Sequence, residues 1–156
     1  MTLEQRDHPN VIAPPPLINL AGLVLGLLLS LIFPVDFLPL TLRLVLGIPL
    51  IVLAAAGLLF SFRTMTRAGT PLDPRKTPKL IVTTGIYRLS RNPIYLTMGI
   101  FVLGVGILAD ALWVVVLAPV IFFIMERGVI AREEKYLERK FGATYLQYKA
   151  AVRRWI

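Results

Sequence analysis

Two polar segments of this 156-residue chain concentrate arginines, tyrosines and glutamates, residue types that bind charged ligands. Residues 85–95 read GIYRLSRNPIY, and residues 132–148 read REEKYLERKFGATYLQY. The stretch between them is apolar, so a helical hairpin there would bring both segments to the same membrane surface. A pocket built from these groups would bind a polar cofactor beside a lipid-like substrate. The pattern therefore predicts an enzyme site at the membrane interface.

Three glutamates share the apolar face of the helix expected after residue 125. At about 100° per residue, the apolar stripe and the three carboxylates fall on one side of that helix: Ile130, Leu137 and Phe141 with Glu126, Glu133 and Glu134. Basic residues take the opposite, solvent-facing side: Arg132, Lys135 and Arg139. A buried carboxylate is costly unless it is paired or holds a ligand. Two readings stay open: a ligand site, or ion pairs that anchor the tail to arginines such as Arg88, Arg91, Arg153 or Arg154.

The segment before the hairpin carries a helix start and a dense polar cluster. Proline is tolerated in the first turn of a helix, so Asn92 is the expected N-cap and Pro93 the first helical residue. That reading does not explain why further functional residue types crowd the same stretch: Gly85, Tyr87, Arg88, Arg91 and Tyr95. Residues 79–85 before it are expected to form an extended strip whose backbone groups could hold a planar ligand.

Composition places the chain in a membrane and excludes several chemistries. Hydrophobic residues make up 56% of the chain, the mean hydropathy is +0.73, and the charges are clustered. The net charge of +8 comes from segments that flank apolar spans, which favours anionic lipid head groups over nucleic acid as partners. Without cysteine there is no disulfide or thiolate site. The single histidine, His8, lies in an expected tail, so no metal site is predicted.

Hydropathy predicts an all-α integral membrane protein with about four transmembrane helices. Residues 17–33 and 40–62 form the first two spans, joined by a proline-rich turn. Residues 94–125 would make one helix of about 48 Å, too long for a hydrocarbon core of roughly 30 Å. A hairpin that turns at Ala109–Asp110 fits better. Asp36 and Asp110 are then exposed loop residues at the far end.

Charge counting orients the spans. Residues 63–91 carry seven lysines and arginines against one acid, and the tail from Glu126 carries eight against four. Four spans put both segments on the cytoplasmic side, with both termini. We expect a single domain over residues 1–156. Its parts are a cytoplasmic tail (1–16), the first two spans (17–62), a cytoplasmic loop (63–93), the helical hairpin (94–125) and a cytoplasmic helical tail that binds cofactor (126–156).

Taken together, the short motifs resemble the isoprenylcysteine carboxyl methyltransferase and phospholipid methyltransferase superfamily of membrane enzymes. The resemblance covers residues 79–156, half of the chain. Its motifs run in order around the hairpin: Lys79-Leu80, Thr84-Gly85-Ile86-Tyr87, Arg91-Asn92-Pro93-Ile94-Tyr95-Leu96, Glu133-Glu134, Phe141-Gly142 and Tyr145-Leu146-Gln147-Tyr148. One departure is Asn92, where the family usually has histidine. Asparagine can position a ligand but cannot shuttle a proton.

The resemblance implies S-adenosylmethionine bound at the cytoplasmic face and a methyl acceptor that enters from the lipid. The residues expected to bind the cofactor are Lys79, Leu80, Val82, Thr83, Gly85, Tyr87, Asn92, Tyr95, Leu96, Glu133 and Glu134. Arg91 and Glu133 are the expected catalytic residues. Expected partners are membrane lipids and a lipophilic or lipidated substrate.

The acceptor and two other functions stay open at this stage. A carboxylate is already nucleophilic at neutral pH and needs no base, whereas an amine needs a base that the sequence does not clearly offer. We therefore expect an isoprenylcysteine-like carboxylate, oriented by Arg91 or a tail arginine, or else a lipid head group. The alternatives are an NADPH-dependent reductase of the sterol reductase type and a non-catalytic protein that binds lipid or a partner.

Overall fold

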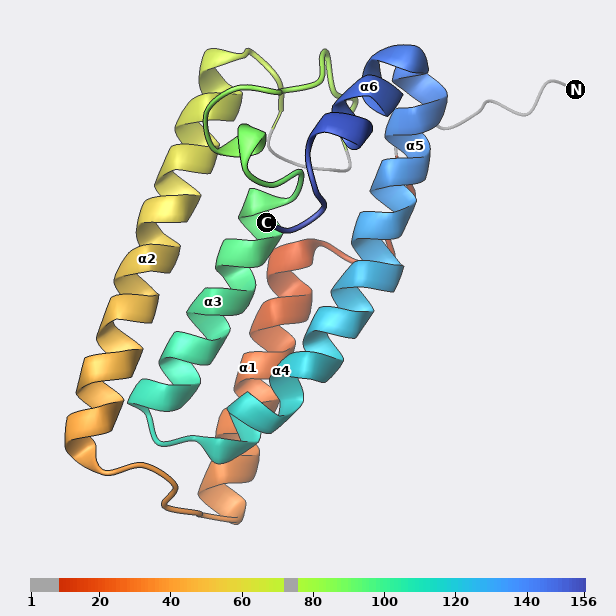
Figure 1. The fold of residues 1–156 in the computed structure, drawn as a ribbon. Coiled ribbons are helices and arrows are strands. Elements are labelled where there is room, and N and C mark those ends of the chain that lie inside the picture. The colour runs from red at the N-terminus through yellow and green to blue at the C-terminus, as the bar shows by residue number, and fades with distance from the viewer. Residues whose placement is uncertain (1–8, 72–75) are drawn as a thin grey trace, which may run out of the picture.

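The computed structural model describes residues 9–71 and 76–156, and every regular element in those ranges is a helix (Figure 1). In chain order the elements are α1 (Pro15–Ile32), α2 (Leu40–Arg67), the short 3-10 helix η1 (Gly85–Arg88), α3 (Pro93–Leu108), α4 (Leu112–Met125), the π-helical turn η2 (Glu126–Ile130), α5 (Ala131–Phe141) and α6 (Ala143–Ala151). The all-α prediction is confirmed. His8 lies outside the described residues.

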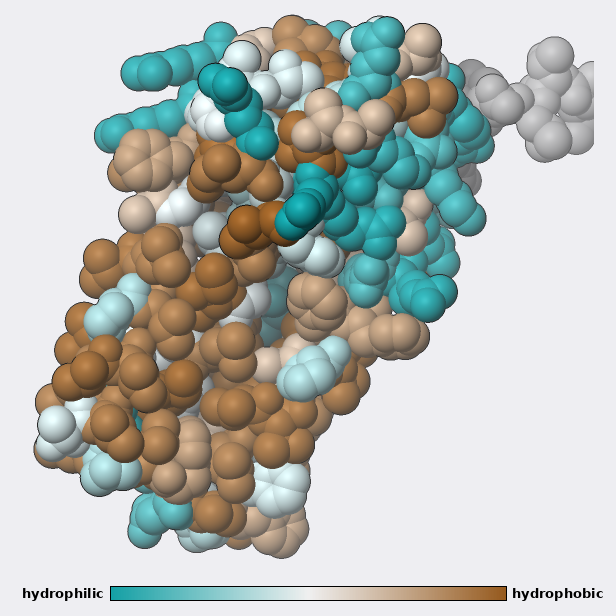
Figure 2. All heavy atoms as spheres, viewed as in Figure 1, coloured by the Kyte–Doolittle hydropathy of each residue, from teal (hydrophilic) through white to brown (hydrophobic). Residues whose placement is uncertain are grey.

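The four helices α1 to α4 alternate in direction and pack side by side (Figure 1). Three helical segments are long and apolar enough to cross a membrane: α1, α2 and the continuous helix Leu112–Phe141. With 16 residues, α3 is shorter, about 24 Å at 1.5 Å per residue. Apolar side chains cover the lower part of the bundle in Figure 2, whereas hydrophilic ones gather around α5 and α6. The chain is therefore built as a membrane protein.

Glycines let neighbouring helices of the bundle approach closely. A Cβ atom on Gly26 of α1 would lie 2.7 Å from the Cα of Val114 on α4, and one on Gly22 would meet the side chain of Ile121. On α2, a Cβ on Gly57 would overlap Thr97 of α3. These small residues therefore serve packing between helices of one chain, as small residues commonly do in membranes.

The far end of the bundle is closed by one ion pair and the hydrogen bonds around it. Arg43 donates from Nε and Nη2 to the carbonyl of Leu108, at 3.2 and 3.0 Å, and its Nη1 lies 3.7 Å from Asp110 Oδ2. The other oxygen of Asp110 accepts from the backbone N–H groups of Phe37 and Leu38. The hairpin turn at Ala109–Asp110 is confirmed. The expectation that Asp110 is simply exposed is wrong, because its carboxylate ties the two far-end loops together.

At the near end, η2 joins α4 to α5 and changes the helical phase by its wider turn. Beyond α5, Gly142 adopts φ +51°, a left-handed conformation that glycine tolerates, and the chain folds back into α6. The last residues then run down between the start of α3 and α5 (Figure 1). We call residues 152–156 the strap.

Candidate active site

A polar pocket forms where the segment before α3 meets α5 and α6. Eight of the predicted residues line it: Leu80, Val82, Tyr87, Arg91, Asn92, Tyr95, Glu133 and Glu134. Further lining comes from α2, α5, α6 and the loop between α2 and η1, including Met65, Thr70, Leu137, Tyr145 and Tyr148. Residues as far apart in the sequence as Met65 and Tyr148 thus contribute to one site. The pocket combines two carboxylates and an arginine with an aromatic wall.

Four predicted residues lie outside this lining. Lys79 and Thr83 are exposed, and the backbone N–H of Lys79 donates to Thr70 Oγ1 at 3.3 Å. Gly85 begins η1 with φ +58°, and a Cβ there would meet Thr64 Oγ1 at 2.9 Å. Leu96 lines a different, apolar groove. Backbone geometry, rather than ligand contact, explains the glycine.

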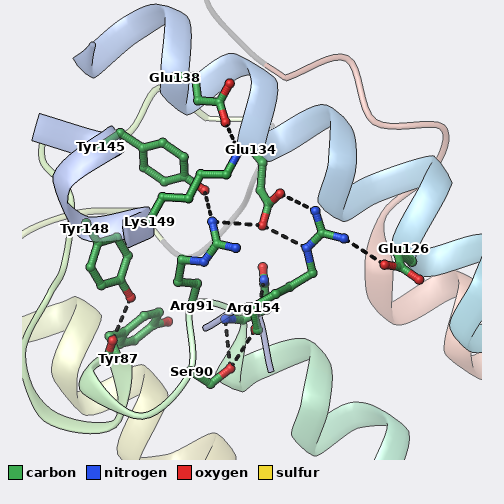
Figure 3. Close-up of polar contacts among 11 residues, drawn as sticks. Tyr87, Ser90, Arg91, Glu126, Glu134, Glu138, Tyr145, Tyr148, Lys149 and Arg154 are labelled. Carbon is green, nitrogen blue, oxygen red and sulfur yellow. Dashed lines mark hydrogen bonds and ion pairs between the residues drawn. The ribbon is translucent and has the colours of Figure 1, made fainter. Parts of the chain in front are cut away.

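Glu134 is the centre of a buried ion-pair cluster (Figure 3). With 5% of its surface exposed, it accepts from Arg154 Nη2 at 2.6 Å and Nε at 3.1 Å, and its Oε1 lies 3.3 Å from Arg91 Nη1. Arg154 also donates to Glu126 at 2.7 Å. Hydrogen bonding to Glu134 raises the pKa of the Arg154 guanidinium, so the arginine stays charged. For Glu134 and Glu126, the ion-pair reading of the sequence is confirmed.

Glu133 is adjacent in sequence but differs in its partners. Its Oε2 accepts a hydrogen bond from the hydroxyl of Tyr95 at 2.7 Å. Within residues 9–71 and 76–156, no lysine or arginine pairs with this carboxylate. Because a carboxylate at a partly buried pocket wall is costly without a cation, Glu133 is suited to bind a positively charged ligand group.

Three tyrosines form the aromatic wall (Figure 3). Tyr145 accepts from Arg91 Nη1 at 3.4 Å, and Tyr148 donates to the carbonyl oxygen of Tyr87 at 2.7 Å. Burial, followed by the charge of Glu134, raises the pKa of Tyr145 to about 12. Burial and then Glu133 raise the pKa of Tyr87 as well. The phenols are therefore neutral near pH 7 and keep their hydroxyl protons.

Tyr145 and Tyr148 belong to the second polar segment but are not among the residues predicted to bind the cofactor or to act in catalysis. The sequence feature that could have identified them is their spacing of three residues. This spacing puts both rings on one face of α6, with centroids 6.3 Å apart. Both are buried on that face. The motif was visible in the sequence, but its contact with Arg91 depends on the fold-back at Gly142.

Asn92 holds the strap rather than capping the helix with its side chain. It occupies the N-cap position before Pro93, as predicted, but it makes no side-chain cap bond. Its Nδ2 instead donates to the carbonyl of Arg154 at 3.3 Å, which also accepts from Ser90 Oγ at 3.0 Å. The N–H of Arg91 donates to the carbonyl of Arg153 at 3.0 Å. The Ser90–Asn92 turn thus fixes the strap over the site.

An apolar groove of about 460 Å³ adjoins the polar pocket. Its walls come mainly from α3 and α4, with Asn19 of α1 and Trp155 of the strap. Tyr95 belongs to the lining of both the groove and the polar pocket. A molecule with an apolar body in the groove could therefore present a polar end at Tyr95 and Glu133.

Comparison with known proteins places most of the chain in one family. The family model for phospholipid methyltransferase matches residues 42–144, a range that holds the Arg91–Tyr95 turn and both glutamates. An uncharacterized protein of Haemophilus influenzae is 56% identical over 39 residues, which cover 24% of this chain and 62% of that protein. No solved structure matches the chain.

Proposed function

The chain belongs to the phospholipid methyltransferase family of membrane methyltransferases, and we propose that it methylates a lipophilic acceptor with S-adenosylmethionine at the cytoplasmic membrane interface. One observation carries the proposal beyond the family. Among the described residues, no arginine or lysine pairs with Glu133, whereas Glu134 beside it has two arginines. The carboxylate of Glu133, which accepts a hydrogen bond from Tyr95, suits a ligand that brings its own positive charge.

The charged and hydrogen-bonding groups of the polar pocket fit S-adenosylmethionine. When bound, S-adenosylmethionine supplies a methyl carbon to which the acceptor's lone pair bonds, while the carbon–sulfur bond breaks toward sulfur. Glu133 would hold the cofactor's ammonium group, at the wall formed with Tyr95. Arg91 offers Nε, a buried donor that has no hydrogen-bond partner among the described residues. That donor suits the cofactor's carboxylate.

The chain's own task in such a transfer is positioning. The rigid turn at Ser90–Asn92 and the ion-pair cluster around Glu134 hold the walls of the site in place. Tyr87, Tyr145 and Tyr148 contribute neutral aromatic surface that excludes water. Alignment of donor and acceptor and removal of water are the main requirements of a displacement at a methyl group.

We propose a lipophilic acceptor whose polar group reaches Tyr95 from the groove. An isoprenylcysteine-like carboxylate and a lipid head group both meet that description. The adjoining groove, which is mainly lined by apolar side chains, supports a lipophilic rather than a freely soluble acceptor.

We further propose that α1 to α4 all cross the membrane, with both termini in the cytoplasm. The alternating direction of the four helices supports this, because it puts the basic loop and the basic tail at the same end (Figure 1). That end would face the cytoplasm by the positive-inside rule. The short α3 is shielded by contacts with α1, α2 and α4, and the polar residue Asp110 follows it at the far end.

Calorimetric titration of the detergent-purified protein tests the function. S-adenosylmethionine should bind, and Glu133→Gln should weaken that binding by roughly 10- to 100-fold, the loss expected for a charge-assisted hydrogen bond. Glu138→Gln is the matched control, because Glu138 pairs with Lys149 outside the pocket. Binding of NADPH alone would favour the reductase. If neither ligand binds, the protein is not a methyltransferase of this kind.

A further inference from the structure

Trp155 is placed at the junction of the strap and the apolar groove. Its ring packs on Phe122 of α4, with centroids 4.8 Å apart and planes inclined by 39°. Trp155 also lines the groove. The residue before it, Arg154, is held by its backbone carbonyl to Ser90 and Asn92 and by its side chain to Glu134 and Glu126. The indole is thus fixed by the same contacts that shape the polar pocket.

The groove has the shape and chemistry for a hydrocarbon chain. The amide of Asn19 donates to the carbonyl of Pro15 at 3.0 Å, so its N–H is satisfied within its own helix. A Cβ atom on Gly99 of α3 would find nothing within 4 Å, which shows open space in the groove wall. Ala118 of α4 is a second small residue in that wall. Tyr95, which lines the groove, also lines the polar pocket.

We infer that Trp155 determines the specificity for the methyl acceptor, by forming the wall against which a single hydrocarbon chain of that acceptor packs in the groove between α3 and α4. This inference rests on the proposed function, and it assigns to Trp155 the selection among acceptors with different hydrocarbon chains. Tyr95 lines both the groove and the polar pocket, so a hydrocarbon chain in the groove lies next to the polar site, as the acceptor's own chain would.

The reason why a bulky side chain would select among acceptors is that the groove is surrounded by lipid. A hydrocarbon chain gains little by leaving lipid for an apolar groove, because lipid tails are as apolar as the groove wall. Selection among chains must then come from close contact and shape, to which a large, rigid aromatic ring contributes most. Because Trp155 lines the groove and not the polar pocket, it should affect the choice of chain and not the binding of cofactor.

Fluorescence quenching can test whether a hydrocarbon chain lies beside Trp155. The protein has two tryptophans, Trp113 and Trp155, so Trp113→Phe leaves Trp155 as the only fluorescent reporter. In nanodiscs of a saturated phosphatidylcholine, a brominated fatty acid is titrated at low mole fraction. We expect quenching that saturates, as for a site.

Adding Gly99→Leu should fill the open space and remove the saturable part, whereas Ala55→Leu, on the exposed side of α2, should keep it. Quenching that rises linearly, or that still saturates with Gly99→Leu, overturns the inference.

Competition among chains tests specificity itself. The protein is equilibrated with equal amounts of a short, a medium and a long saturated fatty acid, and the bound fraction of each is read by native mass spectrometry. Trp155→Ala should shift the ratio several-fold toward longer chains, and Trp155→Phe should shift it less. Calorimetric binding of S-adenosylmethionine should stay the same in both variants. An unchanged ratio with Trp155→Ala overturns the inference.

The two hypotheses fail separately. The quenching and competition measurements need neither cofactor nor turnover, so their failure leaves the methyltransferase proposal in place. Absence of S-adenosylmethionine binding to the unmodified protein would instead refute the proposed function while chain binding could still be observed.

Discussion

The two ends of the bundle use the same residue types in different ways. At the far end Arg43 and Asp110 contact each other and the backbone of both loops. At the near end Arg91, Arg154, Glu126 and Glu134 are joined in one cluster. Glu133 accepts from the hydroxyl of Tyr95 and has no cation partner in the part of the chain that the structure describes. A set of charges that is fully paired holds structure together. An unpaired carboxylate beside such a set indicates a place for a ligand.

The largest expected effect comes from Glu134. Glu134→Gln leaves Arg91 and Arg154 without their shared carboxylate in a buried place, and breaking a buried pair typically costs about 3–5 kcal/mol of stability. We expect a large drop in the thermal unfolding temperature in detergent. Glu138→Gln, in an exposed ion pair, should change it little. Equal stability of the two variants would show that the cluster is not structural.

Glu133 should show the opposite combination. Glu133→Gln removes a partly buried charge that has no cation partner among residues 9–71 and 76–156, so the unfolding temperature should stay the same or rise. Affinity for S-adenosylmethionine should nevertheless fall by roughly 10- to 100-fold. Both quantities are measured on the same preparation. A variant that loses stability and keeps its affinity would reverse the roles given to the two glutamates.

A substitution of Asp110 tests the stabilising role of the ion pair at the far end of the bundle. Asp110→Asn keeps one hydrogen-bond acceptor but removes the charge that faces Arg43, so stability should fall by about 1 kcal/mol. Because this site lies at the other end of the bundle, cofactor affinity should not change (Figure 1). Calorimetry and thermal unfolding together check the prediction. A clear loss of affinity would mean that the two ends are coupled.

The smallest effect near neutral pH concerns Tyr145. Its pKa is raised to about 12 in the folded protein, so the folded state favours the protonated phenol. This contribution to stability is fully present below pH 10, the ordinary tyrosine value, and is lost as the pH rises through about 12. The unfolding temperature should therefore fall more steeply above pH 10 in the unmodified protein than in Tyr145→Phe. Parallel curves would contradict the assignment.

Much of the helical framework could be predicted from local pattern. Apolar runs and prolines predicted α1, α2 and a hairpin turning at Ala109–Asp110. The spacing of charges on α5 also predicted its exposed side correctly, at Arg132, Lys135 and Arg139. These features depend on hydrophobic periodicity and on the length of a bilayer span, which are properties of contiguous sequence.

The site was only partly accessible to the same reasoning. The sequence indicated that Leu80, Tyr87, Arg91 and Tyr95 belong with the glutamates, and all of them line one pocket. It also grouped Leu96 with them, although that side chain lies in the apolar groove. In a helix, consecutive residues point about 100° apart, so Leu96 faces away from the polar pocket, whereas Tyr95 lines both the pocket and the groove. Which space each faces depends on the helices packed around α3.

The sequence by itself determined the helices, the membrane class and the set of charged and aromatic groups available to a site. Only the tertiary structure decided which glutamate is neutralised. Glu133 and Glu134 are the same residue type in adjacent positions, and their difference comes from Arg154, which is brought back by the turn at Gly142 and held by Asn92. An ion pair depends on distances between atoms, and distances between remote segments are fixed only when the chain has folded.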